Sequence, residues 1–290
     1  MAHYAPDKDT FAKLNDSIVV ITGGSTGIGR ATVELLAKAE AKVVVGDVNK
    51  EAGEQLCKEY HGVSFQHCDV TRYDDIYNLF KATFENFRHL DLANSYPETG
   101  NWFDPGLTIE SVGREPGDLK TLDVNVIGTL HFARIAAVFL REGHQKGQDK
   151  SFTILSSVNA FRESPGLYIY QTGKHAVHGT LRSTRKILWE RDGIRVNAVC
   201  PGITDSAMTK HIIHKFKEGG LYWQPADAVG KIIVGISADP SVVGKAFYIE
   251  GGDAWEFEDT FLEYQPQWLG EESTRRMRVN TEAVQKASRL

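Results

Sequence analysis

The sequence predicts an α/β fold, a single doubly wound domain built on a seven-stranded parallel sheet. Short β-branched runs alternate with longer helical patterns, and several of these runs are continuously apolar. Continuously apolar strands are expected where helices cover both faces of a sheet. Strand, helix and strand at this spacing favour parallel strands joined by right-handed crossovers.

The expected elements follow one another without a linker or an internal repeat. Strands are expected at 17–22, 42–47, 63–68, 89–93, 151–157, 194–200 and 245–250. Helical patterns separate them, for instance at 28–40 and 122–143. We therefore assign residues 1–252 to one domain and residues 253–290 to a polar C-terminal extension. This extension contains two tryptophans and a final helical pattern, and we expect it to act as a lid or an oligomer contact.

The composition is that of an ordinary globular protein, with 290 residues, 41% hydrophobic, 24% charged and a net charge of −5. The chain has no continuous apolar run of about 18 residues, so we expect no membrane span. Its beginning lacks the layout of a signal peptide, which favours a cytoplasmic location. The three cysteines are widely spaced and suggest no disulfide framework. The absence of a basic cluster argues against a nucleic-acid partner.

The turn after the first expected strand is rich in glycine, in the stretch "ITGGSTGIGRAT". A helix N-terminus after such a turn presents free N–H groups and a partial positive charge, which suit a pyrophosphate. Glycine lets the backbone turn tightly and approach the phosphates closely. Such a turn also occurs without a ligand, but its place between a strand and a helix favours a dinucleotide site. The residues expected to hold the dinucleotide there are Gly23, Ser25, Thr26, Gly27, Ile28 and Gly29.

Asp47 ends the second expected strand, where the ribose of the adenosine would lie. A carboxylate there accepts hydrogen bonds from ribose hydroxyls and repels a 2′-phosphate, so it favours NAD(H) over NADP(H). The glycine turn offers Ser25 and Thr26 but no cation for such a phosphate. The alternative is a solvated turn aspartate. Asp69, which follows the third strand, could contact the adenine amino group.

Tyr170 and Lys174 are spaced so that both side chains lie on one face of a helix. A free tyrosine, with a pKa near 10, is a poor base, but a neighbouring ammonium stabilises the phenolate. The pair therefore suits general acid/base catalysis. Ser157, at the end of the fifth strand, could hold the substrate oxygen near the tyrosine. The alternative for this spacing is an amphipathic surface helix.

Taken together, these pieces resemble the short-chain dehydrogenase/reductase family over about residues 15–252. The matching stretches are "TGGSTGIG", Asp47, "CDV", "VNVIG", Ser157, "YQTGK" and "NAVCPGITDSAMT". The resemblance implies a Rossmann-type domain that binds NAD(P). By resemblance, Tyr170 is the acid/base, Ser157 orients the substrate oxygen, and Lys174 binds the nicotinamide ribose and lowers the tyrosine pKa. Asn125 anchors a water in the proton relay.

The resemblance also implies further contacts to the cofactor. Ile203 holds the carboxamide through its backbone, and Ser206 stands where threonine is more usual. The other cofactor contacts implied are Asp69, Val70, Asn94, Pro201 and Gly202.

One stretch departs from the family pattern. After the fourth strand the chain reads "DLANSYPETGNW", so that Tyr96 stands where the family has glycine. One interpretation is a shifted loop whose aromatic side chain faces the substrate. The other is that Tyr96 crowds the nicotinamide and weakens cofactor binding. Gly173 in "YQTGK" also replaces a common serine.

The C-terminal "EYQPQWLGEE" is similar to fungal secondary-metabolism members of the 5′-hydroxyaverantin dehydrogenase kind, related to NAD-dependent 15-hydroxyprostaglandin dehydrogenases. That resemblance implies secondary alcohols on sizeable apolar molecules. The side chains expected in the substrate pocket are Tyr96, Phe161, Leu167, Met208 and Trp223. An apolar, aromatic lining suits a lipophilic small molecule. The alternative is that several of these residues only pack a mobile lid.

We expect no metal site, because the histidines lack carboxylate or cysteine partners at ligand spacing. Broad apolar faces at 125–143 and 170–191, which form a four-helix interface in the resembled family, predict a homodimer or homotetramer. The favoured function is an NAD-dependent alcohol dehydrogenase or ketoreductase. The alternatives are a non-redox cyclase, isomerase or dehydratase on the same scaffold, and a cofactor-binding module without catalysis.

Overall fold

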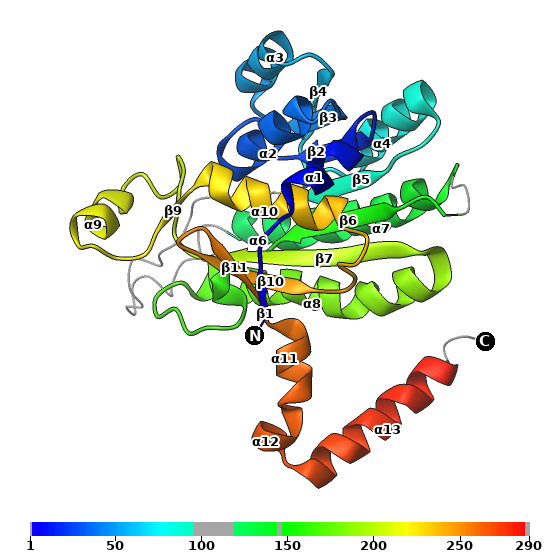
Figure 1. Cartoon of the computed structure of the whole chain (residues 1–290), viewed down its shortest axis with the longest axis vertical. Coiled ribbons are helices and arrows are strands. Elements are labelled where there is room, and N and C mark those ends of the chain that lie inside the picture. The colour runs from blue at the N-terminus through cyan, green and yellow to red at the C-terminus, as the bar shows by residue number, and fades with distance from the viewer. Residues whose placement is uncertain (1, 96–118, 144–146, 288–290) are drawn as a thin grey trace.

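The computed structural model describes residues 2–95, 119–143 and 147–287, and these form a doubly wound α/β sandwich (Figure 1). Its parallel strands run in the order β10-β7-β6-β5-β2-β3-β4. Their bounds are β2 Ile18–Thr22, β3 Lys42–Asp47, β4 Val63–His67, β5 Leu92–Ser95, β6 Lys150–Leu155, β7 Ile194–Pro201 and β10 Ala246–Glu250. The expected fold class and its parallel core are confirmed.

The seven expected parallel strands are all present, but the sheet has nine strands in the described part of the chain, two more than expected. Strand β11 (Asp253–Glu256) pairs antiparallel with β10, and β1 (Ala2–Tyr4) pairs antiparallel with β11. Residues 253–256, which we had expected in the extension, therefore belong to the sheet. The tight turn at Gly251 and Gly252, both with positive φ, lets the chain reverse directly after β10.

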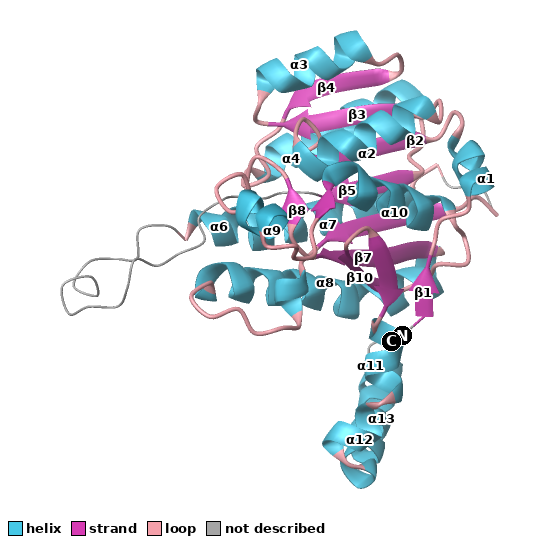
Figure 2. Cartoon of the chain, turned by 60° about the vertical axis from the view of Figure 1, so that its left-hand side comes forward, coloured by secondary structure: helices cyan, strands magenta, loops and turns pink. Residues whose placement is uncertain are grey.

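Helices cover both faces of the sheet, as Figures 1 and 2 show. Successive side chains of β2 pack on opposite faces of the sheet: Ile18 and Val20 lie on one face, and Val19 and Ile21 lie on the other. The first face carries α4 (Tyr73–Phe87), α7 (Gly128–Arg141) and α8 (Tyr168–Asp192); the second carries α2 (Gly27–Lys38), α3 (Lys50–Glu59) and α10 (Ala226–Ala238).

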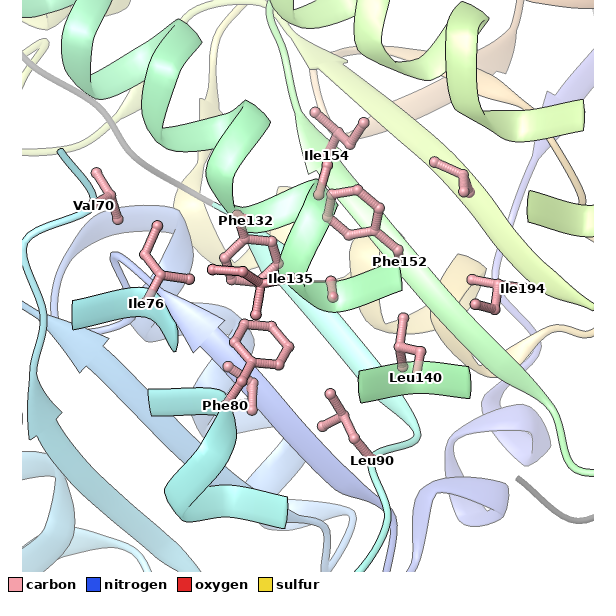
Figure 3. Packing of buried hydrophobic residues seen from close by; sticks show 14 of the residues in the cluster. Val70, Ile76, Phe80, Leu90, Phe132, Ile135, Leu140, Phe152, Ile154 and Ile194 are labelled. Carbon is pink, nitrogen blue, oxygen red and sulfur yellow. The ribbon is translucent and has the colours of Figure 1, made fainter. Parts of the chain in front are cut away.

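The core of the first face is built around three aromatic rings (Figure 3). The rings of Phe80 and Phe132 meet edge to face at 5.1 Å, and Phe132 stacks on Phe152 at 5.6 Å. These three side chains come from α4, α7 and β6, so the contact joins both helices to the centre of the sheet. Aromatic pairs of this kind add about 0.5–1.5 kcal/mol beyond the area that they bury.

The helical stretch Lys120–Arg141 is long and apolar enough to cross a membrane, by length and composition alone. The sequence predicted no membrane span, because the stretch has no uninterrupted apolar run. In the structure it comprises α6 (Lys120–Leu122), a π-helical turn at Asp123–Ile127 and α7. One side of the stretch, with Phe132, Ile135 and Leu140, packs under the sheet, and α7 lies against α4; Leu130 and Val138 on the other side are exposed.

The remaining elements lie at the ends of the chain and around the carboxyl edge of the sheet. They are α1 (Lys8–Phe11), two 3₁₀ turns at Ala12–Leu14 and Val158–Ala160, β8 (Thr204–Asp205), α9 (Ile213–Glu218), β9 (Gln224–Pro225), α11 (Glu258–Glu263), α12 (Gln265–Leu269) and α13 (Glu271–Ala287). Helices α11 to α13 project from the sheet edge away from the domain (Figures 1 and 2). Near its end, α13 touches the domain again where Lys186 donates to Gln285 at 2.8 Å.

A fully buried arginine joins β7 to the residue that precedes β6 and to the end of α10. Arg195 is 0% exposed and donates through Nε and one terminal nitrogen to the two carboxylate oxygens of Asp149, at 2.7 and 2.6 Å. Its remaining N–H groups reach the carbonyls of Ile236, Ser237 and Val242. A guanidinium has five donors in a fixed fork, and each of them has a partner here.

We expect Arg195→Lys to lower the free energy of unfolding by about 3 kcal/mol, because a lysine cannot replace the fork and leaves buried carbonyls unpaired. Urea titration followed by circular dichroism measures this change. The matched control is Arg191→Lys, at an exposed arginine paired with Asp192. This control should change stability by less than about 0.5 kcal/mol. Equal stabilities of the two variants would contradict the prediction.

Candidate active site

The glycine turn between β2 and α2 has the shape expected of a phosphate loop. Gly23 and Gly27 have positive φ, at 69° and 53°. A Cβ on Gly29 would lie 2.0 Å from the carbonyl oxygen of Gly23, so only glycine allows the helix to begin this close to the strand. The N–H groups in the first turn of α2 have no acceptor within the helix and are available to an anion.

Asp47 lies at the end of β3 directly beside this turn. Its Oδ2 accepts a hydrogen bond from the Ser25 N–H at 3.0 Å, and its Oδ1 accepts one from the Asn49 N–H at 2.9 Å. The carboxylate therefore supports the glycine turn, a role that the sequence analysis did not foresee. Two accepted hydrogen bonds leave a carboxylate with further lone pairs for a ligand.

Asp69 and Val70 follow β4 at the same edge of the sheet. Burial would raise the pKa of Asp69, but hydrogen bonds from the Thr71 N–H and hydroxyl, with Lys120 and Arg72 nearby, hold it below its usual value. Val70 is buried in the core and packs directly against Gly128 at the start of α7.

Ser157, Tyr170 and Lys174 lie together where β6 meets α8. All three are buried, and the Lys174 side chain is 0% exposed. Lys174 Nζ lies 3.4 Å from the Leu155 carbonyl and 5.5 Å from the centre of the Tyr170 ring. The Asn159 N–H donates to Ser157 Oγ at 3.2 Å, which leaves the serine hydrogen free to donate elsewhere.

Asn125 lies in the π-helical turn that precedes α7, and its side chain is buried. Neither Oδ1 nor Nδ2 has a hydrogen-bond partner among the described residues. Buried amides are normally satisfied, so this one calls for a water or a ligand atom. Gly173 lies opposite on α8, where a Cβ would be 3.3 Å from Leu122, so the small residue permits close packing of α8 on this turn.

One cavity of about 440 Å³ brings several of the predicted residues together. Ser157 and Tyr170 line it, and so do Ile28 from α2 and the segment Pro201–Ile203 after β7. Ser206 lies beside the glycine turn, since a Cβ on Gly27 would be 3.7 Å from the Ser206 Cβ. Asn94 lies on β5, in register between Ile21 and Thr153.

The residues expected in the substrate pocket separate into three groups. Leu167 and Met208 line the cavity. Phe161 and Trp223 do not: the Phe161 ring packs on Phe257 at 4.5 Å, and Trp223 lies under the Lys217 ammonium at 4.5 Å. Tyr96 lies outside the described residues.

The cavity also has a polar end that the sequence analysis missed. Asn159, Arg162, Tyr248 and Glu250 line it. Tyr248 and Glu250 stand two positions apart on β10, so the period of a strand directs both to one face. That alternation, at the carboxyl end of a parallel strand, is the signal in the sequence that could have found them.

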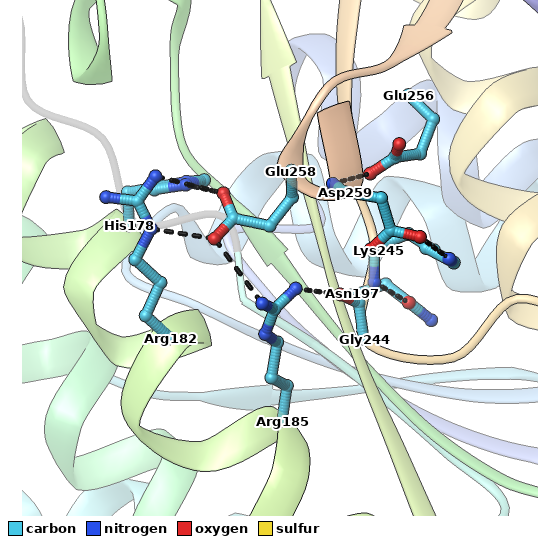
Figure 4. A network of polar contacts seen from close by, with 9 residues as sticks. All are labelled: His178, Arg182, Arg185, Asn197, Gly244, Lys245, Glu256, Glu258 and Asp259. Atoms are coloured by element: carbon cyan, nitrogen blue, oxygen red, sulfur yellow. Dashed lines mark hydrogen bonds and ion pairs between the residues drawn. The ribbon is translucent and has the colours of Figure 1, made fainter. Parts of the chain in front are cut away.

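The wall behind the active site is held by a buried carboxylate from the C-terminal segment (Figure 4). Glu258 is 1% exposed and accepts hydrogen bonds from His178 at 3.0 Å and from Arg182 at 2.8 and 3.0 Å. Arg185 lies 3.7 Å away. Burial opposes ionisation of Glu258, but the His178 and Arg182 partners prevail and lower its pKa to about 2. Helix α8 is thus fixed by residue 258.

A buried thiol connects this network with Ser157. Cys200 Sγ lies 4.0 Å from the other ring nitrogen of His178. Burial raises the pKa of Cys200 to about 12, although hydrogen bonds from the Ser156 side chain and the Ser157 backbone act in the opposite direction. The contacts run from Glu258 through His178 and Cys200 to the backbone of Ser157.

Comparison with known proteins identifies the family. A family model described as short chain dehydrogenase matches residues 17–216. The chain belongs to this family. Within the described ranges, no three His, Cys, Asp or Glu side chains gather in a way that could hold a metal ion.

Several relatives are similar over much of the chain. Short-chain dehydrogenase/reductase ascJ of Acremonium egyptiacum is 31% identical over 260 residues, 87% of this chain and 84% of that protein. 5′-Hydroxyaverantin dehydrogenase of Dothistroma septosporum is 29% identical over 231 residues, 72% of this chain and 74% of that protein. Short chain aldehyde dehydrogenase 1 of Euphorbia lathyris is 35% identical over 197 residues; these are 66% of this chain and 65% of that protein's length.

The fold has a close counterpart in the crystal structure of gox2181, with a TM-score of 0.70 and 21% identity over 84% of this chain and 98% of that one. The predicted resemblance to short-chain dehydrogenases, fungal members included, is therefore confirmed. The chain is an oxidoreductase of this family, whose members bind a nicotinamide dinucleotide. The residues present fit that group. The glycine turn leaves a space that a Cβ at Gly29 would fill, and the first amides of α2 are available to an anion. Among the described residues, the side-chain amide of Asn125 has no hydrogen-bond partner.

We expect Gly29→Ala to weaken NADH binding at least about tenfold, because the added Cβ must displace the Gly23 carbonyl and open the turn. Fluorescence titration measures the affinity. The matched control is Gly179→Ala on α8, where a Cβ would meet nothing within 4 Å. It should keep the affinity and stabilise the helix by about 0.5–1 kcal/mol. Unchanged NADH affinity in the Gly29 variant would refute the prediction.

The Glu258 network predicts a specific loss of stability in acid. The folded-state pKa of about 2 is below the ordinary 4.5, so the contribution is present above pH 4.5 and is lost as the pH falls toward 2. A difference of this size corresponds to about 3 kcal/mol. Glu258→Gln should be less stable than the parent at pH 7, with a shallower decline between pH 5 and 2. The exposed Glu263→Gln should retain the parental curve, and identical curves for all three proteins would refute this assignment.

Proposed function

We propose that this protein is an NAD-dependent dehydrogenase that interconverts a secondary alcohol and a ketone on a lipophilic small molecule. The observation that carries the proposal is the meeting of Ser157 and Tyr170 in one cavity with the end of the glycine turn. The Pro201–Ile203 segment completes the cavity wall on that side. A hydroxyl pair beside a dinucleotide site is what carbonyl and alcohol chemistry requires.

The chain's own residues bind the substrate oxygen and move its proton. Ser157 Oγ accepts from Asn159, so its own hydrogen can donate to the substrate oxygen and orient it. The Tyr170 hydroxyl exchanges the proton with that oxygen. The buried Lys174 ammonium, 5.5 Å from the tyrosine ring, favours the phenolate form. When bound, the nicotinamide supplies or accepts the hydride.

The cofactor preference rests on Asp47. Its carboxylate lies at the end of β3 against the glycine turn, where a 2′-phosphate would meet a like charge. Arg30 is the first basic residue after the glycine turn. It already forms ion pairs with Glu34 and Glu59 and so offers no unpaired cation to a 2′-phosphate. NAD(H) is therefore favoured over NADP(H).

The substrate is proposed to be lipophilic because apolar side chains dominate the cavity wall. Those contributed by the segment after Gly202 are Ile203, Met208, Ile212, Phe216 and Leu221. We further propose a cytoplasmic homodimer or homotetramer without nucleic-acid or membrane partners. Exposed apolar residues on the two long helices of one face support the oligomer: Leu130 and Val138 on α7, and Ile187 and Trp189 on α8.

Tyr170→Phe should lower kcat by about 10²–10⁴-fold, because it removes the proton-transfer group, while NADH affinity stays within about twofold of the parent. Tyr168→Phe, two positions earlier and exposed, is the matched control and should retain full turnover. Steady-state formation of NADH from secondary alcohols measures both. Parental turnover in the Tyr170 variant would overturn the catalytic assignment.

Titration with NADH and with NADPH tests the cofactor proposal directly, by energy transfer from the tryptophans to the nicotinamide. NADH should bind at least about tenfold more tightly than NADPH, because Asp47 repels the additional phosphate. Asp47→Asn should reduce this preference. If neither nucleotide binds, the nicotinamide site is closed and the redox function fails.

A further inference from the structure

The cavity of the proposed active site has a polar end that the alcohol–ketone chemistry does not use. We propose that Tyr248 and Glu250 form a subsite for a second hydroxyl group of the substrate, so that the substrates are lipophilic alcohols or ketones that carry a phenol or a further alcohol. This inference rests on the proposed function, because it assigns the polar end of the same cavity.

The carboxylate of Glu250 is held ready to accept a hydrogen bond. The Tyr248 hydroxyl donates to Glu250 Oε2 at 2.7 Å. Burial and this hydrogen bond raise the pKa of Tyr248 to about 12, so the tyrosine remains a donor at neutral pH. Among the described residues, no donor lies within hydrogen-bond distance of Glu250 Oε1. Because Glu250 is half-buried in the cavity wall, its Oε1 is available to accept a hydrogen bond from a ligand.

Gly202 provides the space for this carboxylate. A Cβ at Gly202 would lie 2.3 Å from Glu250 Oε2 and 2.8 Å from Oε1, so both oxygens rest directly on its backbone. Gly202 itself lines the cavity, beside the Ile203 backbone that would hold the cofactor. The carboxylate therefore lies in the same wall as the reacting end of the site and not in a separate surface recess.

The charges around the cavity favour a neutral hydrogen-bond donor. Arg162 also lines the cavity, and both Arg162 and Glu250 act electrostatically on the Tyr248 hydroxyl. The described residues give neither Arg162 nor Glu250 an ion-pair partner within 4 Å. A carboxylate on the substrate would be repelled by the carboxylate of Glu250, and an ammonium on the substrate would be repelled by the guanidinium of Arg162. A hydroxyl can donate to Glu250 without either repulsion.

The first test compares two secondary alcohols that differ only in the proposed contact: 4-phenylcyclohexanol and 4-(4-hydroxyphenyl)cyclohexanol. With NAD⁺, the parent enzyme should prefer the hydroxylated alcohol by about tenfold to a hundredfold in kcat/KM, because a hydrogen bond to a carboxylate replaces an unmet acceptor. Glu250→Gln should reduce this preference at least about threefold, because the bond loses its charge. The exposed Glu163→Gln, in the same loop as Arg162, is the matched control and should keep the preference.

A binding measurement separates failure of the subsite from failure of the proposed function. 4-Cyclohexylphenol and its methyl ether cannot be oxidised at a secondary alcohol, and ligand-observed NMR compares their affinities. The phenol should bind at least about tenfold more tightly than the ether to the parent, and the Glu250→Gln variant should lose most of that difference. If the phenol preference holds but neither cyclohexanol is oxidised, the subsite stands and the dehydrogenase function fails. Equal binding of phenol and ether, or a preference unchanged by Glu250→Gln, overturns the subsite.

Discussion

The site depends on an ammonium group without access to water. Burial of a charge is costly unless the group is hydrogen-bonded and enclosed by well-packed structure. Lys174 meets this requirement with the Leu155 carbonyl at the end of β6 and the face of Tyr170. The contact between Lys174 and the Leu155 carbonyl also fixes α8 against β6. Ser157, which follows β6, is therefore held beside Tyr170 on α8. The geometry of Ser157, Tyr170 and Lys174 and the packing of the core are therefore one constraint.

Much of this arrangement could be predicted from the sequence, because it arises from local spacing and from sheet topology. The interval between Tyr170 and Lys174 specifies one helix face, and the crowded start of α2 requires glycine at 29. Parallel strands present their carboxyl ends at a single edge, so the strand order alone predicts that Asp47 and Ser157 share that edge.

What could not be predicted depends on contacts between distant segments. Phe161 faces away from the cavity because its ring packs on Phe257, which follows it by almost a hundred positions. Glu258 is an ordinary acidic residue in a polar stretch, and only the fold brings it to His178 and Arg182. Strands β1 and β11 were missed because they are short and lack an alternating apolar pattern.

The pairing of β1 with β11 also has a consequence for synthesis of the chain. Ala2 is in register with Glu256, and His3 reaches Asp253, 250 residues away. At about 5–20 residues per second on a ribosome, the first strand waits about 10–50 s for its partner to be made. During that interval the residues of β1 have no partner strand, because β11 has not yet been made. Strand β1 therefore cannot take its place in the sheet until residues 253–256 have been made and can pair with it.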